Sequence, residues 1–343
     1  MNFMIDAIKK VVEGEHLSES EAEQAMAAIM DGMATPAQIA ALVTALRMKG
    51  ETVEEITGFV RAMRERSAKV KCSRSPLIDT CGTGGDKLNT FNISTAAAFV
   101  AAGAGAAVAK HGNRAASSKC GSADVLEALG VRIALSPEDV GRCIDECGIG
   151  FMFAPLMHPA MKHAIGPRKE IGIRTVFNIL GPMTNPAGAD RQLIGVFAPH
   201  LCKLVAKVLS RLGAERAMVV HGVDGLDEVS TIGDTIMVEW YKGEIISKVV
   251  NPVEMNVPVA NPSEIAGGET PEDNAKILLA VMQGERGARR DAVVVNAAAA
   301  LLAAGRADTT SEAMELAAES IDSGAAMRTL ESLRKFTQEC AAS

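Results

Sequence analysis

The strongest constraint on this fold is a repeated pattern that begins near Pro76. Short apolar runs end in polar or glycine-rich loops, and each loop leads into a stretch with helical periodicity. The predicted strands are residues 76–81, 106–110, 149–154, 193–198 and 217–220. The predicted helices between them include residues 124–129, 137–147 and 201–212. Strands that alternate with helices predict parallel βαβ units, so we expect an α/β fold whose mostly parallel central sheet is flanked by helices.

The first seventy residues have a different pattern, which predicts several short helices. Ser18 with Glu21 and Thr52 with Glu55 match the capping box, in which each side chain satisfies a backbone N–H at a helix start. Apolar residues recur at helical spacing after the Thr35-Pro36 cap and again after the box at Thr52. We therefore expect a small all-helical domain at the N-terminus.

The remainder of the chain completes the larger domain. Residues 237–241 and 244–250 flank a Lys-Gly turn and predict a hairpin at an antiparallel edge of the sheet. From Thr270 onward the pattern is mostly helical. The expected domains are therefore a helical one at 1–72 and an α/β one at 73–343, closely packed because no low-complexity linker separates them.

The composition excludes several functions. A net charge of −7 and an aromatic content of 3% argue against binding to nucleic acid, which needs clustered cations or stacking platforms. Seven scattered cysteines without a CxxC pair argue against a zinc site or disulfide framework and favour the cytoplasm. The N-terminus lacks the apolar segment of a signal peptide, and the alanine-rich run at 296–304 is too short to span a bilayer. We expect neither a membrane nor a nucleic acid as a partner.

The loop after the first predicted strand, residues 79–86, is rich in glycine. Glycine lets the backbone approach a phosphate closely, and the start of the next helix adds N–H donors and a positive dipole. Asn92, Ser94 and Thr95 add neutral donors there. The loop is not a dinucleotide fingerprint, because Lys87 stands where a glycine is required, nor does it match a Walker A loop. A glycine turn with ordinary helix caps is the alternative interpretation.

The second loop begins at Lys110 and runs to Ser122. Lys110, Arg114 and Lys119 place three cationic side chains in this stretch, directly after a strand in an acidic protein. Together with several hydroxyls and two glycines, they suit a second and more highly charged phosphate group. A solvated basic loop is the alternative.

An acidic loop at 224–230 follows the strand at 217–220. The adjacent carboxylates Asp227 and Glu228 suit magnesium, which completes its coordination shell with water and substrate oxygens. An ordinary acidic turn is the alternative interpretation.

A fourth segment, residues 157–186, carries further candidates. The segment includes Arg168 and Arg174, and an arginine near the strand ends could form a bidentate pair with a carboxylate. His158 has either a structural role or a role in binding, and His221 is left open because it ends a strand beside the acidic loop.

Taken together, these motifs resemble the anthranilate phosphoribosyltransferase family of the nucleoside phosphorylase-like superfamily, along nearly the whole chain. The segments that carry the resemblance are 82–86, 90–95, 110–130, 158–162, 172–182 and 226–230. The resemblance implies a homodimer formed through the helical domain. It also implies a reaction in tryptophan biosynthesis. In this reaction, phosphoribose moves from phosphoribosyl pyrophosphate (PRPP) to the amine of anthranilate with Mg²⁺, giving N-(5-phosphoribosyl)anthranilate and pyrophosphate.

The resemblance also implies three groups of site residues. The PRPP-binding group is Gly82, Gly85, Asp86, Thr90, Asn92, Ser94, Thr95, Lys110, His111, Gly112, Asn113, Arg114, Ala115, Ala116, Ser117, Ser118 and Ser122. The anthranilate-binding group is Gly82, Asn113, Arg168, His111 and His158. The magnesium ligands are Ser94, Asp227 and Glu228. Two positions depart from the family pattern: Lys87 replaces a glycine, and Cys120 stands where serine is common.

No side chain is predicted to act as a general acid or base, because the neutral amine of anthranilate is already a nucleophile. Two other functions are weighed against this one. A pyrimidine nucleoside phosphorylase would carry a Ser- and Gly-rich, Lys-Met-Ser-type stretch where this chain has residues 110–114. A catalytically silent binding paralogue would not need the complete set of ligands.

Overall fold

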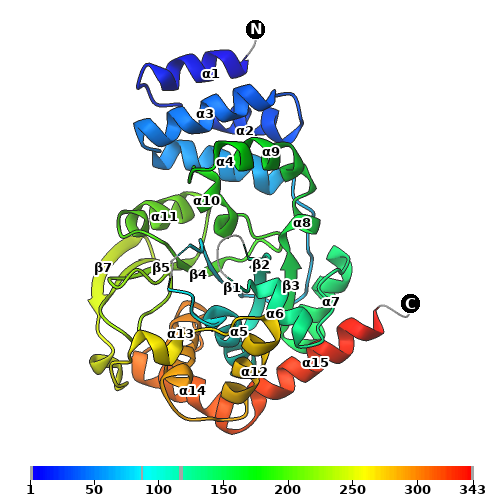
Figure 1. The fold of residues 1–343 in the computed structure, drawn as a ribbon, viewed down its shortest axis with the longest axis vertical. Coiled ribbons are helices and arrows are strands. Elements are labelled where there is room, and N and C mark those ends of the chain that lie inside the picture. The colour runs from blue at the N-terminus through cyan, green and yellow to red at the C-terminus, as the bar shows by residue number, and fades with distance from the viewer. Residues whose placement is uncertain (1–2, 86–87, 116–118, 341–343) are drawn as a thin grey trace.

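The computed structural model describes residues 3–85, 88–115 and 119–340. The N-terminal unit is all-helical, as predicted (Figure 1). Its helices are α1 (Phe3–Val12), α2 (Glu19–Met30), α3 (Pro36–Lys49) and α4 (Val53–Glu65). Both predicted capping boxes are confirmed: the Glu21 N–H donates to Ser18 Oγ at 3.3 Å, and the Glu55 N–H to Thr52 Oγ1 at 3.2 Å.

Seven strands of the described chain form one mixed sheet. They are β1 (Leu77–Gly82), β2 (Ala107–Gly112), β3 (Ile149–Phe153), β4 (Arg191–Gly195), β5 (Arg216–Gly222), β6 (Thr235–Tyr241) and β7 (Glu244–Val250). Their order is β3-β2-β1-β4-β5-β6-β7, with β1 to β5 parallel and β6 and β7 antiparallel. The predicted parallel strands and the antiparallel edge hairpin are confirmed, with ends that differ by a few residues.

Helices cover both faces of this sheet (Figure 1). They are α5 (Ile93–Gly103), α6 (Ser122–Ala128), α7 (Pro137–Cys147), α8 (Ala154–Met157), α9 (Lys162–Ile171), α10 (Phe177–Leu180), α11 (His200–Arg211), α12 (Pro271–Met282), α13 (Ala288–Ala303), α14 (Thr310–Asp322) and α15 (Ala325–Glu339). Short 3-10 turns lie at Pro159–Met161, Gly181–Met183, Val253–Met255 and Pro262–Ile265. None of the helices in the described ranges is long and apolar enough to cross a membrane.

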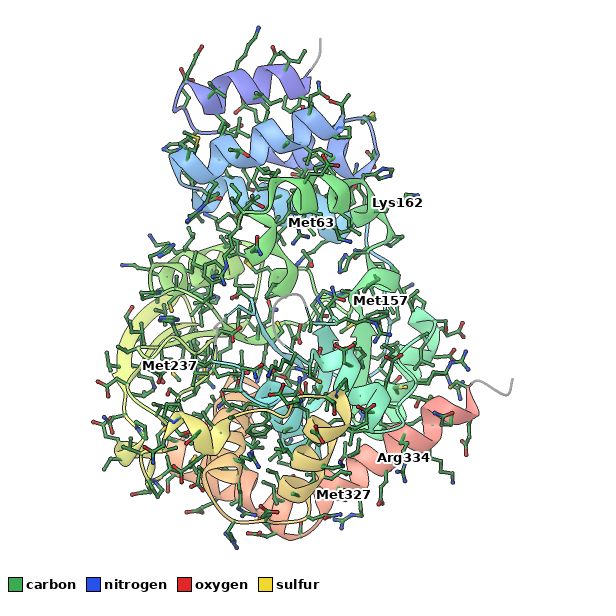
Figure 2. All side chains as sticks on the ribbon, in the orientation of Figure 1. Met63, Met157, Lys162, Met237, Met327 and Arg334 are labelled. Carbon is green, nitrogen blue, oxygen red and sulfur yellow. The ribbon has the colours of Figure 1, made fainter. Side chains whose placement is uncertain are left out.

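Two hydrophobic cores hold these layers together. One core packs α5 and α12 to α15 against the sheet. The other joins α1 to α4 with α10, α11 and the opposite face of β4 to β6, so the helical unit shares a core with the sheet. Met63 of α4 and Lys162 at the start of α9 mark the region where α9 joins the helical layer (Figure 2). The Arg64 side chain crosses the same junction and donates to the Met183 carbonyl at 2.8 Å.

The strand order creates a switch point between β1 and β4. From β1 the chain continues outward to β2 and β3, whereas β4 and β5 lie on the other side of β1. The chain leaves β1 toward α5 and β4 toward α11, on opposite faces of the sheet. The carboxyl edge between these two strands is the position at which open α/β sheets have their binding crevice. The predicted glycine-rich and acidic loops both belong to this edge.

Candidate active site

The loop after β1 is fastened to the end of β4. Gly84 and Gly85 have φ values of 69° and 85°, a left-handed conformation that glycine adopts without steric cost. The Thr83 N–H donates to the Gly195 carbonyl at 2.9 Å. The Phe197 N–H in turn donates to Thr83 Oγ1 at 3.0 Å. The glycine loop is thus an ordered element at the switch point.

The start of α5 lies directly behind this loop. Asn92 occupies the N-cap position, but its side chain makes no bond to the helix. Its Nδ2 donates to the Cys120 carbonyl at 3.1 Å, and its Oδ1 is buried without a partner in the described chain. Ser94 is half-buried and Thr95 is buried in the first turn. Since no side chain caps the first N–H groups of α5, they and the helix dipole suit an anion.

Lys110 and His111 lie within β2, not in a loop. The strand extends to Gly112, past the predicted end at 110. The Lys110 ammonium is buried and donates to the Thr80 carbonyl of β1. Burial lowers the pKa of Lys110, and the nearby Asp79 carboxylate opposes this shift. The prediction that Lys110 stands on a basic loop is therefore wrong: the ammonium is bound to the adjacent strand.

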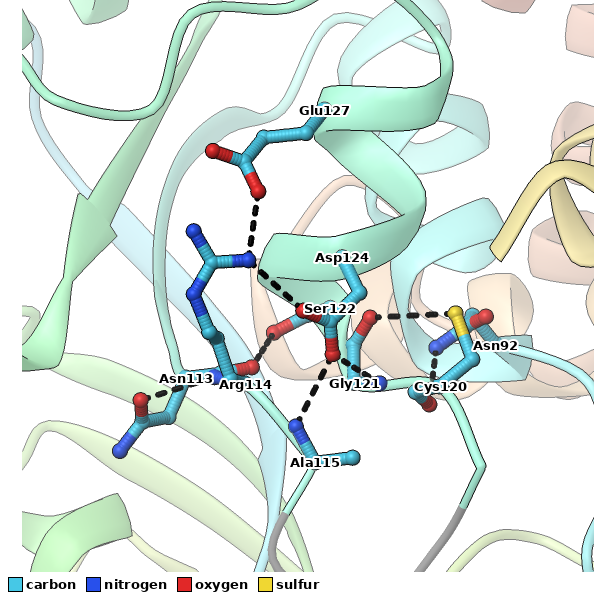
Figure 3. Close-up of polar contacts among 9 residues, drawn as sticks. All are labelled: Asn92, Asn113, Arg114, Ala115, Cys120, Gly121, Ser122, Asp124 and Glu127. Atoms are coloured by element: carbon cyan, nitrogen blue, oxygen red, sulfur yellow. Dashed lines mark hydrogen bonds and ion pairs between the residues drawn. The ribbon is translucent and has the colours of Figure 1, made fainter. Parts of the chain in front are cut away.

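Arg114 turns toward α6 (Figure 3). Its Nη1 lies 2.8 Å from Asp124 Oδ1 and 2.5 Å from Glu127 Oε2. Asp124 Oδ2 also accepts hydrogen bonds from the backbone N–H groups of Ala115, at 3.0 Å, and Gly121, at 2.9 Å. Arg114 lies in the loop after β2, as predicted, and acidic side chains of α6 pair with it there. Its ion pairs and the bonds of Asp124 bring the two ends of the second loop together.

The remaining predicted PRPP residues have mixed placements. Ser122 Oγ donates to the Asn113 carbonyl at 3.2 Å, so these two residues lie together at the start of α6 (Figure 3). Thr90 forms an isolated antiparallel bridge with Ala266. Four predicted residues, Asp86, Ala116, Ser117 and Ser118, lie outside the described residues, as does Lys87.

The acidic loop between β5 and β6 reaches the glycine loop. Asp227 is buried, and its Oδ2 accepts a hydrogen bond from the Gly84 N–H at 2.7 Å. Glu228 and Ser94 line the same small cavity at the ends of the strands. The other residues that line it are Thr80, Cys81, Ala97, Leu193, Gly195, Val220 and Asn296. The three side chains predicted to hold magnesium are therefore gathered at one edge of the sheet.

Asn296 of α13 holds the acidic loop in place and was not identified from the sequence. Its Oδ1 accepts from the Val229 N–H at 2.8 Å, and its Nδ2 donates to the Val229 carbonyl at 2.9 Å. Asn296 is 1% exposed, so this pair of hydrogen bonds is shielded from water. The only signal in the sequence is a single asparagine within an alanine-rich run, where polar side chains are otherwise absent.

His111 and His158 form a buried imidazole pair. Their ring centroids are 5.0 Å apart, and both Nε2 atoms are buried without a partner in the described chain. Burial lowers the pKa of His111 to about 3, with a further contribution from His158. Burial lowers the pKa of His158 to about 4, and Lys69 adds to this. Both rings are therefore neutral at pH 7, and two orphaned ring nitrogens suit contact with a ligand.

Arg168 lies in the last turn of α9. Its guanidinium stacks over the Phe177 ring, 5.2 Å from the centroid, and burial lowers its pKa. Within the described ranges no carboxylate forms an ion pair with it, which leaves the cation available to an acidic ligand. His221, left open above, is buried, and its Nδ1 lies 2.7 Å from the Val196 carbonyl. This contact places His221 in the packing between β4 and β5.

Comparison with known proteins gives matches over nearly the whole chain. The model described as "Glycosyl transferase family, a/b domain" matches residues 74–327, and the "Glycosyl transferase family, helical bundle domain" matches residues 5–67. The anthranilate phosphoribosyltransferase of Pelotomaculum thermopropionicum is 58% identical, and the match covers 97% of this chain and 96% of that protein. The enzyme of the same name from Moorella thermoacetica is also 58% identical, with 98% of each chain covered.

Solved structures give the same result. The anthranilate phosphoribosyltransferase of Thermus thermophilus has a TM-score of 0.92 at 46% identity and covers 97% of this chain and 99% of its own. The Saccharomyces cerevisiae enzyme in complex with PRPP and Mg has a TM-score of 0.89 at 28% identity, with 98% of each chain covered. A second structure of that yeast enzyme, in complex with 4-fluoroanthranilate, has a TM-score of 0.88 at 27% identity.

Proposed function

This chain belongs to the glycosyl transferase family that contains the anthranilate phosphoribosyltransferases, and on that premise we propose the reaction of its switch-point site. The site transfers phosphoribose from PRPP to the amine of anthranilate, producing N-(5-phosphoribosyl)anthranilate and pyrophosphate in tryptophan biosynthesis. One observation carries the proposal. The Asp227 carboxylate contacts the Gly84 N–H, while Glu228 and Ser94 line one cavity beside it. An acidic loop and an anion-suited glycine loop therefore share one crevice.

The donor atoms of this crevice fit Mg²⁺. Asp227, Glu228 and Ser94 offer carboxylate and hydroxyl oxygens, which are the ligands that this cation prefers. In the described ranges no three His, Cys, Asp and Glu side chains form a metal cluster by themselves. Water and phosphate oxygens would therefore complete the shell, as is usual for Mg²⁺. When bound, Mg²⁺ would supply positive charge for the departing pyrophosphate.

PRPP is proposed to bind across the glycine loop and the start of α5. The backbone of Gly82 and Gly85 would approach its phosphates, and Asn92, Ser94 and Thr95 would supply donors at the helix start. The other predicted PRPP residues are kept in the proposal with the placements given above. Because its ammonium is bound to β1, Lys110 would act mainly through the positive potential that it adds below the crevice.

Anthranilate is proposed to bind beside the imidazole pair. The Arg168 guanidinium would pair with its carboxylate, and Gly82, Asn113, His111 and His158 would surround its ring. Two features support this assignment: the absence of a carboxylate partner for Arg168 in the described chain and the two unpartnered Nε2 atoms. A second candidate function is not supported by any particular contact in the site.

Catalysis would depend on position and charge. The side chains hold the neutral amine of the acceptor in line with the anomeric carbon, which converts a bimolecular step into an effectively unimolecular one. The N-terminus of α5 would stabilise negative charge on the departing oxygen. His111 and His158 are already neutral at pH 7, and neither is needed as a base, since the amine carries its own lone pair.

The chain is further proposed to act as a cytoplasmic homodimer, with a helical domain at 1–72 and an α/β domain at 73–343. Exposed apolar side chains on the helical unit support its role as the contact surface: Val12, Met33 and Met48 are 67%, 69% and 83% exposed. Light scattering on wild type and on a triple variant with serine at these positions would test the dimer. Monomeric wild-type protein at micromolar concentration would contradict it.

The reaction is tested by following anthranilate fluorescence with enzyme, PRPP and Mg²⁺, and in controls that omit each component. We expect the signal to decline only in the complete mixture. No decline with folded protein would contradict the proposal. Phosphorylase activity with uridine, thymidine and phosphate would then be measured, to test the alternative of a pyrimidine nucleoside phosphorylase.

A further inference from the structure

We propose that Arg174 is a positioning residue that holds the glycine loop in its PRPP-binding shape, an inference that rests on the proposed function. The Arg174 Nη2 donates to the Gly85 carbonyl at 2.7 Å. Gly85 is 89 residues away in the sequence and belongs to the loop after β1. Arg174 lies in the segment 172–182 that carries the family resemblance, but no contact with the glycine loop was predicted for it, and this contact emerges only from the fold.

A cation–π contact orients the Arg174 guanidinium. The guanidinium lies over the Phe197 ring, with 4.5 Å between its central carbon and the ring centroid. Stacking on an aromatic face orients the planar guanidinium, so fewer orientations compete with the hydrogen bond. Phe197 also anchors the other end of the loop, because its N–H donates to Thr83 Oγ1 at 3.0 Å. Phe197 therefore contacts the loop at two points. Its backbone binds Thr83 directly, and its ring orients Arg174, which binds Gly85.

The segment that carries Arg174 is itself anchored on both sides. Gly172 ends α9 in a left-handed conformation, and its N–H donates to the Arg168 carbonyl at 3.3 Å. The Thr175 N–H donates to Asn178 Oδ1 at 2.9 Å. Arg174 therefore projects from an ordered turn, although its side chain is exposed. Its backbone is only six positions from Arg168, the residue proposed to hold the aromatic acid.

Gly85 is suited to this contact in two ways. Its φ of 85° is a conformation that other residues rarely adopt, and a Cβ placed there would lie 2.5 Å from Arg174 Nη2. The arginine thus occupies the space that a side chain would fill. In the described chain no carboxylate pairs with Arg174, so its charge remains beside the loop proposed to receive the phosphates. The end of α9 and the turn after it would therefore serve both substrates: Arg168 in the last turn of α9 would face the acceptor, and Arg174 would shape the PRPP loop.

The test separates the two substrates. The variants are Arg174→Ala, Arg174→Lys and Phe197→Leu, measured in the full-length enzyme with Mg²⁺. Arg142→Ala is the matched control, because Arg142 is also an exposed arginine, stacked 4.9 Å from the Phe336 centroid on α15, away from the crevice. For each variant, KM for PRPP and KM for anthranilate are measured at saturating co-substrate. PRPP binding is measured separately by calorimetry.

Arg174→Ala is expected to raise KM and Kd for PRPP roughly tenfold, the usual effect of losing one hydrogen bond from a charged donor. KM for anthranilate should change less than twofold. Arg174→Lys should recover part of the loss, Phe197→Leu should raise KM for PRPP about two- to threefold, and Arg142→Ala should match wild type. Equal changes in both KM values, or a lower thermal midpoint with unchanged PRPP binding, would overturn the inference. A wild-type enzyme that binds PRPP but transfers no phosphoribose would overturn the proposed function instead. The ratio of the Kd for PRPP of Arg174→Ala to that of wild type, measured by calorimetry, would still test the role of Arg174.

Discussion

Lowering the pH from 7 to 5 should destabilise the folded chain through His111 and His158. Burial holds the pKa of His111 at about 3 and that of His158 at about 4, whereas histidine in an unfolded chain titrates near 6.5. Between pH 6.5 and about 4, the unfolded chain therefore binds more protons than the folded one. By linkage, the free energy of unfolding then falls as the pH falls through this window.

The size of the effect follows from these pKa values. At pH 5 each imidazole lowers the free energy of unfolding by about 2 kcal/mol relative to its value at high pH, so the pair lowers it by about 4 kcal/mol. Asp79 acts in the opposite direction. Burial raises the pKa of Asp79 to about 6, so the folded state takes up a proton at a higher pH than the unfolded chain does. This uptake raises the free energy of unfolding by about 1 kcal/mol at pH 5. These three groups together predict a net loss of roughly 2 to 3 kcal/mol between pH 7 and pH 5.

Urea unfolding at both pH values would measure this loss. The double variant His111→Gln with His158→Gln should lose about 4 kcal/mol less than wild type over the same interval. His200→Gln, on an exposed histidine at the start of α11, is the matched control and should behave as wild type. All three proteins share the other titrating groups, so the contribution of those groups cancels when the changes in unfolding free energy are subtracted. If wild type and the double variant lose the same free energy, the reasoning from buried neutral imidazoles is refuted.

Three further predictions concern the crevice. Asp227→Asn combined with Glu228→Gln should lower turnover by roughly a hundredfold or more at fixed Mg²⁺, measured as initial rates over a magnesium series; near-normal rates would contradict the metal assignment. Asn296→Leu should cost about 2 to 4 kcal/mol of unfolding free energy, since it leaves both backbone groups of Val229 unpaired in the core; an unchanged urea midpoint would argue against it. Arg168→Ala should raise KM for anthranilate at least about tenfold while KM for PRPP stays within about twofold, because a charge-assisted pair is lost. An unchanged KM for anthranilate in steady-state kinetics would remove that role.

Local patterns predict local structure well in this chain. The capping boxes at Ser18 and Thr52 form as expected, because each depends on residues only three positions apart. The hairpin of β6 and β7 also follows from neighbouring residues. The end of β2 was harder to place, since Lys110 and His111 interrupt an apolar run although both are buried in the strand. Hydrophobic periodicity cannot detect a polar side chain whose partner lies on another strand.

The candidate site is only partly visible in the sequence for the same reason. Loop composition points to the glycine loop and to Asp227, but Asn296 and Arg174 act over 67 and 89 residues. The pairing of Arg114 was within reach of sequence reasoning. Its partners Asp124 and Glu127 follow ten and thirteen residues later, in the short helix α6 that comes next in the chain. Cations near an acidic helix start are often paired, which makes them poor evidence for a phosphate site.

The switch point depends on two glycines, of which the loop motif identifies Gly82 but not Gly195. Gly82 at the end of β1 and Gly195 at the end of β4 are register partners in the parallel sheet. A Cβ on either would collide with Asp227, with its carboxylate at Gly82 and with its backbone at Gly195. The acidic loop can therefore lie across both strand ends only because neither partner has a side chain. This close approach brings the Asp227 carboxylate to the Gly84 N–H, so the spacing of the glycine loop and the acidic loop is set by Gly195 as much as by the loops themselves.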